Sequence, residues 1–368
     1  MIIMALDHVR DFIHRGAMLS QQATNLATTT PILFMTRWIT HFCAPVFMFT
    51  AGMGALFYLQ HGRTRAQLAR FLVTRGTWLI FLELTLMQLL YNFGISSQYP
   101  IFLLVLYVLG ACMIILAALI WLPLPLLTVL SIATIVLHHL LDGPRSTSAL
   151  WMLLHQQGAF PFGGRVFIAA YQLVPWFAVM SLGYCTASVF SWEPARRQRL
   201  LWRAGIAMTI AFLVLRVVNS YGDPSRWSWQ PTATFTVLSV LNTTKYPPSL
   251  MFLLMTLGPT IAFLAGAERA RGWLSGVLAT FGRVPMFYYL LHIPLIHGTA
   301  LLVWMMRDGA ARGERFASAP YVAIPPDERW SLALLYLVFV VVVAALYPLC
   351  RWYGRLKATS QAAWLRYI

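Results

Sequence analysis

Charged and imidazole side chains occur inside segments that are otherwise apolar enough to cross a lipid bilayer. They form three clusters: Asp7, His8, Arg10 and Asp11; Arg37 and His41; and His292 and His297. An ionisable side chain at membrane depth costs several kcal/mol on most scales, so it persists mainly where it faces a cavity, a partner or a reaction. These positions are therefore the first candidates for a functional site.

In the first cluster, Asp7, Arg10, Asp11 and His14 follow the spacing i, i+3, i+4, i+7, which places them on one stripe of a helix. His8 lies three residues before Asp11. A carboxylate can orient a histidine and raise its basicity, and a histidine near its unperturbed pKa of about 6.5 is suited to proton transfer. The same stripe is also compatible with a self-neutralised ion cluster, and both interpretations stay open.

The second cluster, Arg37 and His41, has the i, i+4 spacing of one helical face. If the segment enters the membrane near Pro31, a rise of about 1.5 Å per residue puts His41 close to the bilayer centre. We expect His41 to act as a general acid or base, and Arg37 to hold an anionic group such as a thioester oxygen or a phosphate. A histidine bonded to a neighbouring helix, beside a kink at Pro45, is the structural alternative.

His292 lies nine residues after Arg283, where the last-but-one apolar segment begins. The same rise puts His292 at the depth of His41, approached from the opposite face. We therefore expect these side chains to meet in a buried pocket, with Tyr288 donating a hydrogen bond to His292. The candidate catalytic residues are Asp7, His8, His41 and His292.

The composition indicates the elements that must position these residues. Of 368 residues, 59% are hydrophobic and 10% are charged, whereas a soluble domain carries about 25% charged residues. We predict an all-α, polytopic integral membrane bundle of about ten spans, each near the ~20 residues that a bilayer needs. The predicted spans are 1–15, 31–59, 77–96, 100–121, 123–141, 165–190, 201–220, 247–266, 284–306 and 329–350.

Charge along the chain predicts the orientation of these spans. Connections 61–76, 191–204 and 267–283 and the tail 351–368 hold 15 basic and two acidic residues. The opposite connections hold nine basic and six acidic residues. By the positive-inside rule, both termini lie in the cytoplasm. The net charge of +16 thus reflects topology, and a nucleic-acid partner is not expected.

We predict a single membrane-embedded domain over 1–368. Its four cysteines have no CxxC or metal-ligand spacing, so neither a disulfide framework nor a metal site is expected. Only six apolar residues precede Asp7, and the first span looks truncated. Glu83 is expected to form a structural salt bridge with Arg37 or Arg10, and His138 and His139 are expected to be solvated.

Five segments together resemble a known family. They are Leu6-Asp-His-Val-Arg-Asp-Phe12, Thr36-Arg-Trp-Ile-Thr-His-Phe-Cys-Ala-Pro-Val-Phe47, Leu173-Val-Pro-Trp-Phe177, Lys245-Tyr-Pro-Pro-Ser-Leu250 and Gly282–His297. The chain resembles bacterial relatives of heparan-alpha-glucosaminide N-acetyltransferase, and the resemblance spans most of its length. It implies a multi-span acyltransferase of the bacterial inner membrane that uses acetyl-CoA, or another acyl-CoA, as co-substrate. The characterised eukaryotic member moves acetyl from cytoplasmic acetyl-CoA to a glucosamine amine across the membrane.

Two departures from the family pattern matter. The family usually opens with a basic/Asp-x-Leu-Arg-Gly stretch, whose absence here supports a truncated start. The eukaryotic enzyme has its catalytic histidine in the first luminal loop, after an asparagine on the first span. Asp7 stands where that asparagine would be, and residues 15–30 contain no histidine. The catalytic histidine is therefore taken from the residue pattern, with His41 preferred.

The main hypothesis is an acyltransferase with a membrane-buried histidine as general base. Direct transfer and a transient acyl-histidine are both compatible with the sequence. The residues expected to bind acyl-CoA are Arg37, Arg63, Arg65 and Arg283. Binding of anionic lipid is the alternative for the loop arginines. The expected partners are a small-molecule or glycan acceptor, membrane lipid and, in a homodimer, a second copy of the chain.

A proton-coupled transporter or permease is the rival function, because buried His, Asp and Arg side chains with broken helices fit it as well.

Overall fold

The structure is a computed structural model that describes residues 1–14, 23–97, 99–143, 145–308, 327–360, 362 and 365. It is mostly helical, with 73% helix and 5% strand, which confirms the predicted helical fold class. The chain forms two compact units. Unit 1 comprises Met1–Cys43, Leu86–Tyr99 and Ala270–Ile368, and unit 2 comprises Ala44–Thr85 and Pro100–Arg269. The expectation of a single domain stays a prediction.

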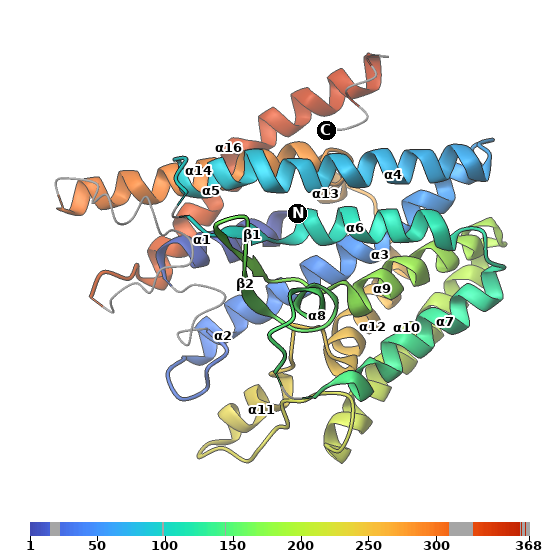
Figure 1. Cartoon of the computed structure of the whole chain (residues 1–368), viewed down its shortest axis with the longest axis horizontal. Helices are drawn as coiled ribbons and strands as arrows, with labels where there is room; N and C mark the ends of the chain where they lie inside the picture. The colour runs from blue at the N-terminus through green and yellow to red at the C-terminus, as the bar shows by residue number, and fades with distance from the viewer. Residues whose placement is uncertain are drawn as a thin grey trace. The chain divides into compact units, whose positions relative to one another are not determined.

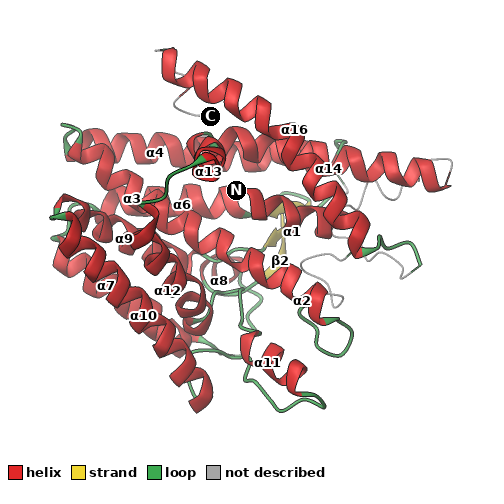
Figure 2. Ribbon diagram, turned by 180° about the vertical axis from the view of Figure 1, so that it is seen from behind, coloured by secondary structure: helices red, strands yellow, loops and turns green. Residues whose placement is uncertain are grey.

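Unit 1 holds all four candidate catalytic residues, Asp7, His8, His41 and His292. Its helices are α1 (Ile2–Ile13), α2 (Pro31–Trp38), the 3₁₀ helix η1 (Ile39–Phe42), α5 (Gln88–Asn92), α13 (Trp273–Arg283), α14 (Pro285–Asp308) and α16 (Leu332–Thr359). Helix α1 packs against α14 and α16, and α14 and α16 lie side by side in Figures 1 and 2. The start of α2 is fixed by Thr30, whose hydroxyl accepts from the backbone N–H of Leu33 at 3.3 Å, with Pro31 in the first turn.

The predicted second span does not keep one α-helical geometry from α2 into α3 (Cys43–Gln60). An unbroken α-helix would need the N–H of Pro45 to bond to the carbonyl of His41, and proline has no N–H. The chain forms η1 instead, whose period is three residues per turn rather than 3.6. Arg37 and His41 therefore do not follow the continuous α-helical spacing from which their shared face was predicted.

Unit 2 contains most of the remaining helices. These are α4 (Arg65–Leu82), α6 (Val105–Leu119), α7 (Leu124–Leu137), η3 (His138–Leu141), α8 (Ala149–Leu154), α9 (Leu173–Thr186), η4 (Ala187–Ser191), α10 (Pro194–Val218), α11 (Ala233–Leu241) and α12 (Leu250–Ala267). Helix α3 and the π-helical segment η2 (Glu83–Met87) each have residues in both units.

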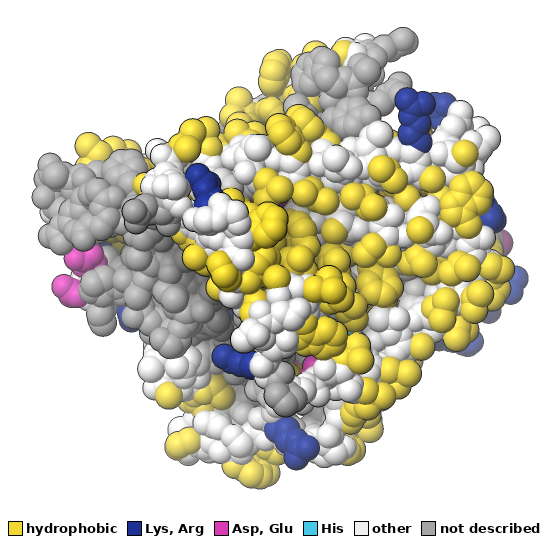
Figure 3. All heavy atoms as spheres, viewed as in Figure 1, with side chains coloured by type: hydrophobic (Ala, Val, Ile, Leu, Met, Phe, Trp, Pro, Cys, Tyr) yellow, Lys and Arg dark blue, Asp and Glu magenta, His cyan; other side chains and the backbone are white. Residues whose placement is uncertain are grey.

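Two helix pairs in unit 2 approach closely through glycines. A Cβ on Gly76 of α4 would lie 2.5 Å from the carbonyl oxygen of Gly110 on α6. Gly205 of α10 and Gly258 of α12 face each other in the same way, and α10 and α12 lie side by side in Figures 1 and 2. Small residues at such crossings are typical of helices packed in membranes. Figure 3 shows hydrophobic side chains gathered on the outer face of α4 and α6.

Seven helical segments among the described residues are long and apolar enough to cross a membrane. They are Pro31–Gln60, Leu124–Leu141, Leu173–Ser191, Pro194–Val218, Leu250–Ala267, Pro285–Arg307 and Leu332–Thr359; Val105–Leu119 is apolar but shorter. The chain is an integral membrane protein. The count of ten spans and the orientation of the termini stay predictions.

A small sheet replaces helix at two predicted positions. Its strands are β1 (Ile101–Leu103), β2 (Gly158–Phe162) and β3 (Arg165–Ala169), in the order β1-β3-β2. Strand β3 is parallel to β1 and antiparallel to β2. Gly163 and Gly164, both with positive φ, form the two-residue turn that joins β2 to β3. The predicted spans 100–121 and 165–190 were therefore wrong at their first residues.

Three predicted basic connections contain helix. Helix α4 begins at Arg65 because Thr64 and Gln67 form a reciprocal capping box. Helix α10 begins at Pro194, and Trp273–Arg283 forms α13. Helices α4 and α10 thus begin with arginine-containing turns before the predicted apolar spans, whereas α13 is a separate helix within a predicted connection. Most of the predicted connection 307–328 lies outside the described residues.

Candidate functional site

A network of ion pairs joins α1 to α2 inside unit 1. The carboxylate of Asp7 accepts from Arg10 at 3.1 Å and also from Arg37, and Arg10 pairs with Asp11. Arg10 is only 1% exposed. A buried charge must be paired to be tolerated, and here two guanidinium groups are matched by two carboxylates. The ion-cluster interpretation of the first stripe therefore describes these contacts, and the network fixes how α1 lies against α2.

His8 lies between this network and α14. Its Nδ1 is 4.0 Å from Oδ2 of Asp11. The centroid of its ring is 5.1 Å from that of His292 and 6.4 Å from that of Tyr91. The first helix thus places an imidazole next to a histidine that is more than 280 residues away in the sequence.

The hydrogen bonds of His292 determine which of its ring nitrogens carries a proton. Nδ1 lies 2.7 Å from the carbonyl oxygen of Tyr289 and 3.1 Å from that of Tyr288. A carbonyl only accepts, so we assign the proton of the neutral ring to Nδ1, which leaves a lone pair on Nε2. Nε2 is fully buried and has no hydrogen-bond partner among the described residues. The neutral ring thus keeps an acceptor nitrogen that is buried within unit 1.

Tyr288 supports His292 differently from our expectation. The two rings stack, with centroids 5.3 Å apart. The hydroxyl of Tyr288 has no hydrogen-bond partner within the described part of the chain, so the predicted hydroxyl donation to His292 was wrong. The i, i+4 spacing on α14 brings ring to ring, because side chains one turn apart lie above one another.

His41 is buried in η1, and η1 packs against α1. Arg37 also reaches the hydroxyl of Thr40 at 3.3 Å, next to His41 in sequence. His41 therefore belongs to the same unit as Asp7 and His292, but its convergence with them in one pocket stays a prediction.

The arginines predicted to bind acyl-CoA occupy different environments. Arg37 is buried and paired with Asp7, whereas Arg283, at the end of α13, is exposed. Arg63 and Arg65 are exposed in unit 2, and the guanidinium of Arg63 lies 5.8 Å from the ring centre of Tyr58. Their role toward a phosphate stays a prediction.

Aromatic side chains pack around His297, which follows His292 on α14. His297 stacks on Phe93 at 4.0 Å and lies 4.8 Å from Phe12, while its Nδ1 is 3.3 Å from the carbonyl oxygen of Leu90. These contacts give His297 a packing role between α14 and α5. Tyr91, which approaches both His8 and Tyr289, was missed because a tyrosine in an apolar segment does not reveal which distant side chains it contacts.

Glu83, the two histidines of η3 and His155 serve local structure in unit 2. Glu83 accepts from the backbone N–H groups of Leu106 and Tyr107, at the start of α6. His139 and His155 both bond to Asp142, at 2.7 and 3.0 Å. The expectation that His138 and His139 are solvated was wrong, because His138 is 2% exposed. Among the described residues, no group of three His, Cys, Asp or Glu side chains is arranged to hold a metal ion.

Comparison with known proteins gives one family. The family model described as heparan-alpha-glucosaminide N-acetyltransferase, catalytic, matches residues 2–225. A search of curated proteins finds no match. The matched region contains Asp7, His8, Arg37 and His41, and His292 lies beyond it. The His8–His292 contact therefore joins the matched region to a helix outside it.

Proposed function

Because the chain belongs to the heparan-alpha-glucosaminide N-acetyltransferase catalytic family, a membrane acetyltransferase family, we propose that it is a membrane acyltransferase. It moves an acetyl or other acyl group from acyl-CoA to an amine or hydroxyl group of an acceptor, most simply a sugar.

The observation that supports this proposal most directly is the arrangement of the His292 ring, with Nδ1 hydrogen-bonded to a carbonyl and Nε2 buried without a partner among the described residues. Its Nδ1–H is held by the carbonyl of Tyr289, so the ring presents a fixed acceptor in a dry environment beside His8. A general base must hold its free nitrogen toward the proton that it removes. A neutral imidazole with one nitrogen anchored and the other open meets that need.

A single general base is sufficient for the transfer. The acceptor nitrogen or oxygen attacks the thioester carbonyl carbon and forms the new C–N or C–O bond. Nε2 of His292 takes the acceptor's proton, the C–S bond breaks, and the same proton passes to the departing thiolate. The products are the acylated acceptor and free CoA, and His292 returns to its starting form.

The ion network has a positioning role in this proposal. Asp7, Arg10 and Arg37 fix α1 against α2. They thereby fix His8 next to His292, with Asp11 on its other side. Holding the groups in one geometry removes part of the entropic barrier to reaction.

The donor is proposed to enter near exposed arginines. Arg63 and Arg65 in unit 2, and Arg283 in unit 1, each carry a guanidinium group suited to a phosphate of CoA. Arg37, already paired with Asp7, is proposed to donate a further hydrogen bond to the thioester oxygen of the donor, because a guanidinium group carries five N–H donors.

The test measures acyl transfer directly. Purified full-length protein in detergent receives labelled acetyl-CoA with and without glucosamine, and both free thiol and labelled product are measured. His292→Asn retains an amide N–H to bond Tyr289 but lacks Nε2. Since general base catalysis contributes about 10²–10⁴-fold, this variant should lose that factor while it melts at the temperature of the unchanged protein.

Three outcomes separate the alternatives. Full activity in His292→Asn together with complete loss in His41→Gln would move the base to His41 and leave acyl transfer intact. If labelled product still forms at the unchanged rate when both His41 and His292 are replaced, neither histidine is the general base. Glucosamine flux into sealed vesicles with no thiol release at any acyl-CoA concentration would replace the enzyme with a carrier.

A further inference from the structure

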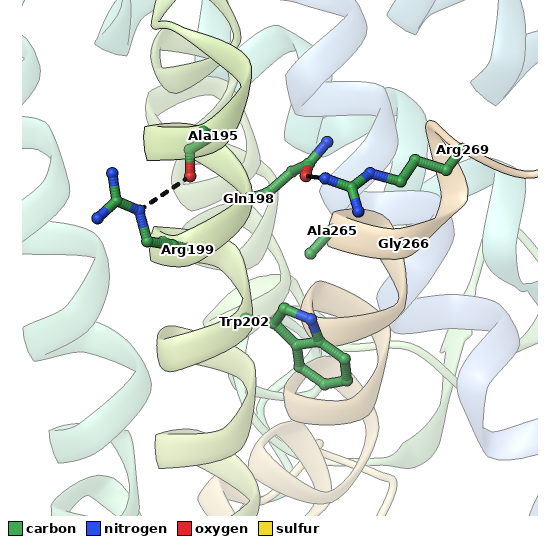
Figure 4. Close-up of a pocket in the computed structure, with 7 residues that line it drawn as sticks. All are labelled: Ala195, Gln198, Arg199, Trp202, Ala265, Gly266 and Arg269. Atoms are coloured by element: carbon green, nitrogen blue, oxygen red, sulfur yellow. Dashed lines mark hydrogen bonds between the residues drawn. The ribbon is translucent and has the colours of Figure 1, made fainter.

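A cavity of about 320 Å³ opens between the first turns of α10 and the end of α12, within unit 2. It is lined by Ala195, Gln198, Arg199, Trp202, Ala265, Gly266 and Arg269. Figure 4 shows Gln198 and Arg269 meeting above the cavity, with Trp202 one turn further along between the two helices. This cavity is separate in sequence from every residue used in the proposed acyl transfer.

The charge around the cavity is strongly positive. Residues 193–203 and 268–269 hold five arginines and two glutamates. Both glutamates are already engaged. Glu193 accepts from two backbone N–H groups at the start of α10, and Glu268 pairs with Arg197 at 2.6 Å. Neither glutamate forms an ion pair with an arginine of the cavity lining.

Two arginines of the lining bond only to neutral acceptors. The Nε of Arg199 donates to the carbonyl of Ala195 at 3.3 Å, and Arg269 donates to the side-chain oxygen of Gln198 at 2.6 Å. Within the described part of the chain, neither guanidinium lies within 4.0 Å of a carboxylate oxygen. Two cationic groups at one cavity, each with unused donors, are suited to a phosphate.

The surface beyond the cavity is apolar. Trp202 is 52% exposed and Phe263 is 69% exposed, and Ile206 and Ile210 continue the exposed face along α10. Both helices belong to the segments able to span a membrane. A tryptophan between arginines and an exposed aliphatic face is typical of the boundary between headgroups and acyl chains. The site thus suits a molecule with an anionic head and apolar chains.

We propose that this cavity binds the phosphate headgroup of an anionic phospholipid. Arg199 and Arg269 hold the phosphate, Trp202 lies at the glycerol level, and the acyl chains follow the exposed face of α10 and α12. Basic pockets between membrane helices bind anionic headgroups by this combination of charge and hydrophobic contact. Bound lipid would clamp the pair α10–α12 at its basic end.

The test compares lipids that differ only in their headgroup. Purified full-length protein in detergent is titrated with phosphatidylglycerol or phosphatidylcholine of the same acyl composition, and the melting temperature is recorded. A ligand that binds only the folded state raises that temperature as its concentration increases. We expect phosphatidylglycerol to stabilise the protein more, and the double variant Arg199→Gln/Arg269→Gln to lose most of the difference.

Two further variants separate the cavity from general charge. Arg226→Gln removes an exposed arginine in the loop after the opposite end of α10 and should respond as the unchanged protein does. A Cβ on Gly266 would meet nothing within 4 Å. Because Gly266 lines the cavity, Gly266→Leu adds a bulky side chain at its wall with both arginines kept, and it should lose the phosphatidylglycerol effect as well.

The remaining outcomes overturn the proposal. Equal stabilisation by the two lipids would show that the cavity does not bind the anionic headgroup. Stabilisation by acetyl-CoA or inorganic phosphate that disappears in Arg199→Gln/Arg269→Gln assigns the cavity to a soluble phosphate. If that double variant does not fold, brominated phosphatidylglycerol provides a second measurement. It should quench the unchanged protein more than Trp202→Phe, and equal quenching contradicts the site.

Discussion

Asp7 on α1 and Arg37 on α2 form an ion pair although 30 residues separate them in the sequence. The same carboxylate also accepts from Arg10. The first role of Asp7 is therefore structural, because its carboxylate links α1 to α2. Through this anchor, α1 holds His8 against His292, and the arrangement of the proposed base depends on a carboxylate that need not touch substrate.

Removal of this anchor charge should destabilise the protein strongly. Asp7→Asn leaves Arg10 and Arg37 with less compensating charge in a buried place, and a broken buried pair costs about 3–5 kcal/mol. Thermal unfolding in detergent would measure the loss. Asp7→Asn/Arg37→Gln should recover part of it, because the second change removes a charge left without its partner. A double variant less stable than the sum of the two single ones would contradict this account.

His8 and His292 should act in the same step of the reaction. The rings lie 5.1 Å apart, so a variant of either should change the same step. We expect His8→Gln to lower kcat with little change in the KM for the donor. In His8→Gln/His292→Asn, the loss should not exceed that of His292→Asn alone, because residues that act as a unit are strongly non-additive. If the double variant instead shows the product of the two single losses in the acyl-transfer assay, the two histidines work independently.

The sequence predicted local relationships better than distant ones. The helical spacing of Asp7, Arg10 and Asp11 was sufficient to predict a cluster, because one helix sets all three positions. The contacts Asp7–Arg37 and His8–His292 depend on the packing of helices far apart in sequence, and periodicity contains no information about that packing. The estimated membrane depths placed His41 and His292 at one level, but depth does not indicate which helices are neighbours.

The missed sheet and the buried histidines have similar causes. Strands β2 and β3 lie in an apolar stretch, where alternation is hidden because polar residues that would mark one face are few. His138 and His139 were placed in water because they end a helix. The chain then folds back so that Asp142 bonds to both His139 and His155, a contact that loop geometry alone decides.

The link between Glu268 and Arg197 should weaken in acid. The hydrogen bond from Arg197 holds the pKa of Glu268 below its ordinary value of 4.5. A lowered folded-state pKa contributes stability above the ordinary value, and that contribution is lost as the pH falls through the lowered one. Glu268 is partly exposed, so the gain at pH 7 is about 1 kcal/mol or less. The melting temperatures of the unchanged protein and Glu268→Gln should differ at pH 7, and the difference should begin to shrink as the pH falls below 4.5.

The Asp142 cluster should stabilise unit 2 without affecting catalysis. Asp142→Asn weakens two hydrogen bonds from imidazoles, each of the charge-assisted kind that contributes about 1.5–3 kcal/mol. We expect a lower melting temperature together with an unchanged KM for donor and acceptor at a temperature where the variant is folded. A selective rise in the KM for the acceptor would instead place this cluster in the acceptor site.

Replacement of glycine by alanine should lower stability where two helices cross closely, and it should not lower stability where the glycine faces open space. In Gly76→Ala, the new Cβ would lie 2.5 Å from the carbonyl oxygen of Gly110, so α4 and α6 must separate. Overpacking of this kind costs about 1–3 kcal/mol. At Gly54 of α3, a Cβ meets nothing within 4 Å, and alanine favours a helix over glycine by about 1 kcal/mol. Gly54→Ala should therefore raise the melting temperature or leave it unchanged, while Gly76→Ala lowers it. If both variants shift in the same direction, contact between the two helices at Gly76 does not determine how tightly they pack.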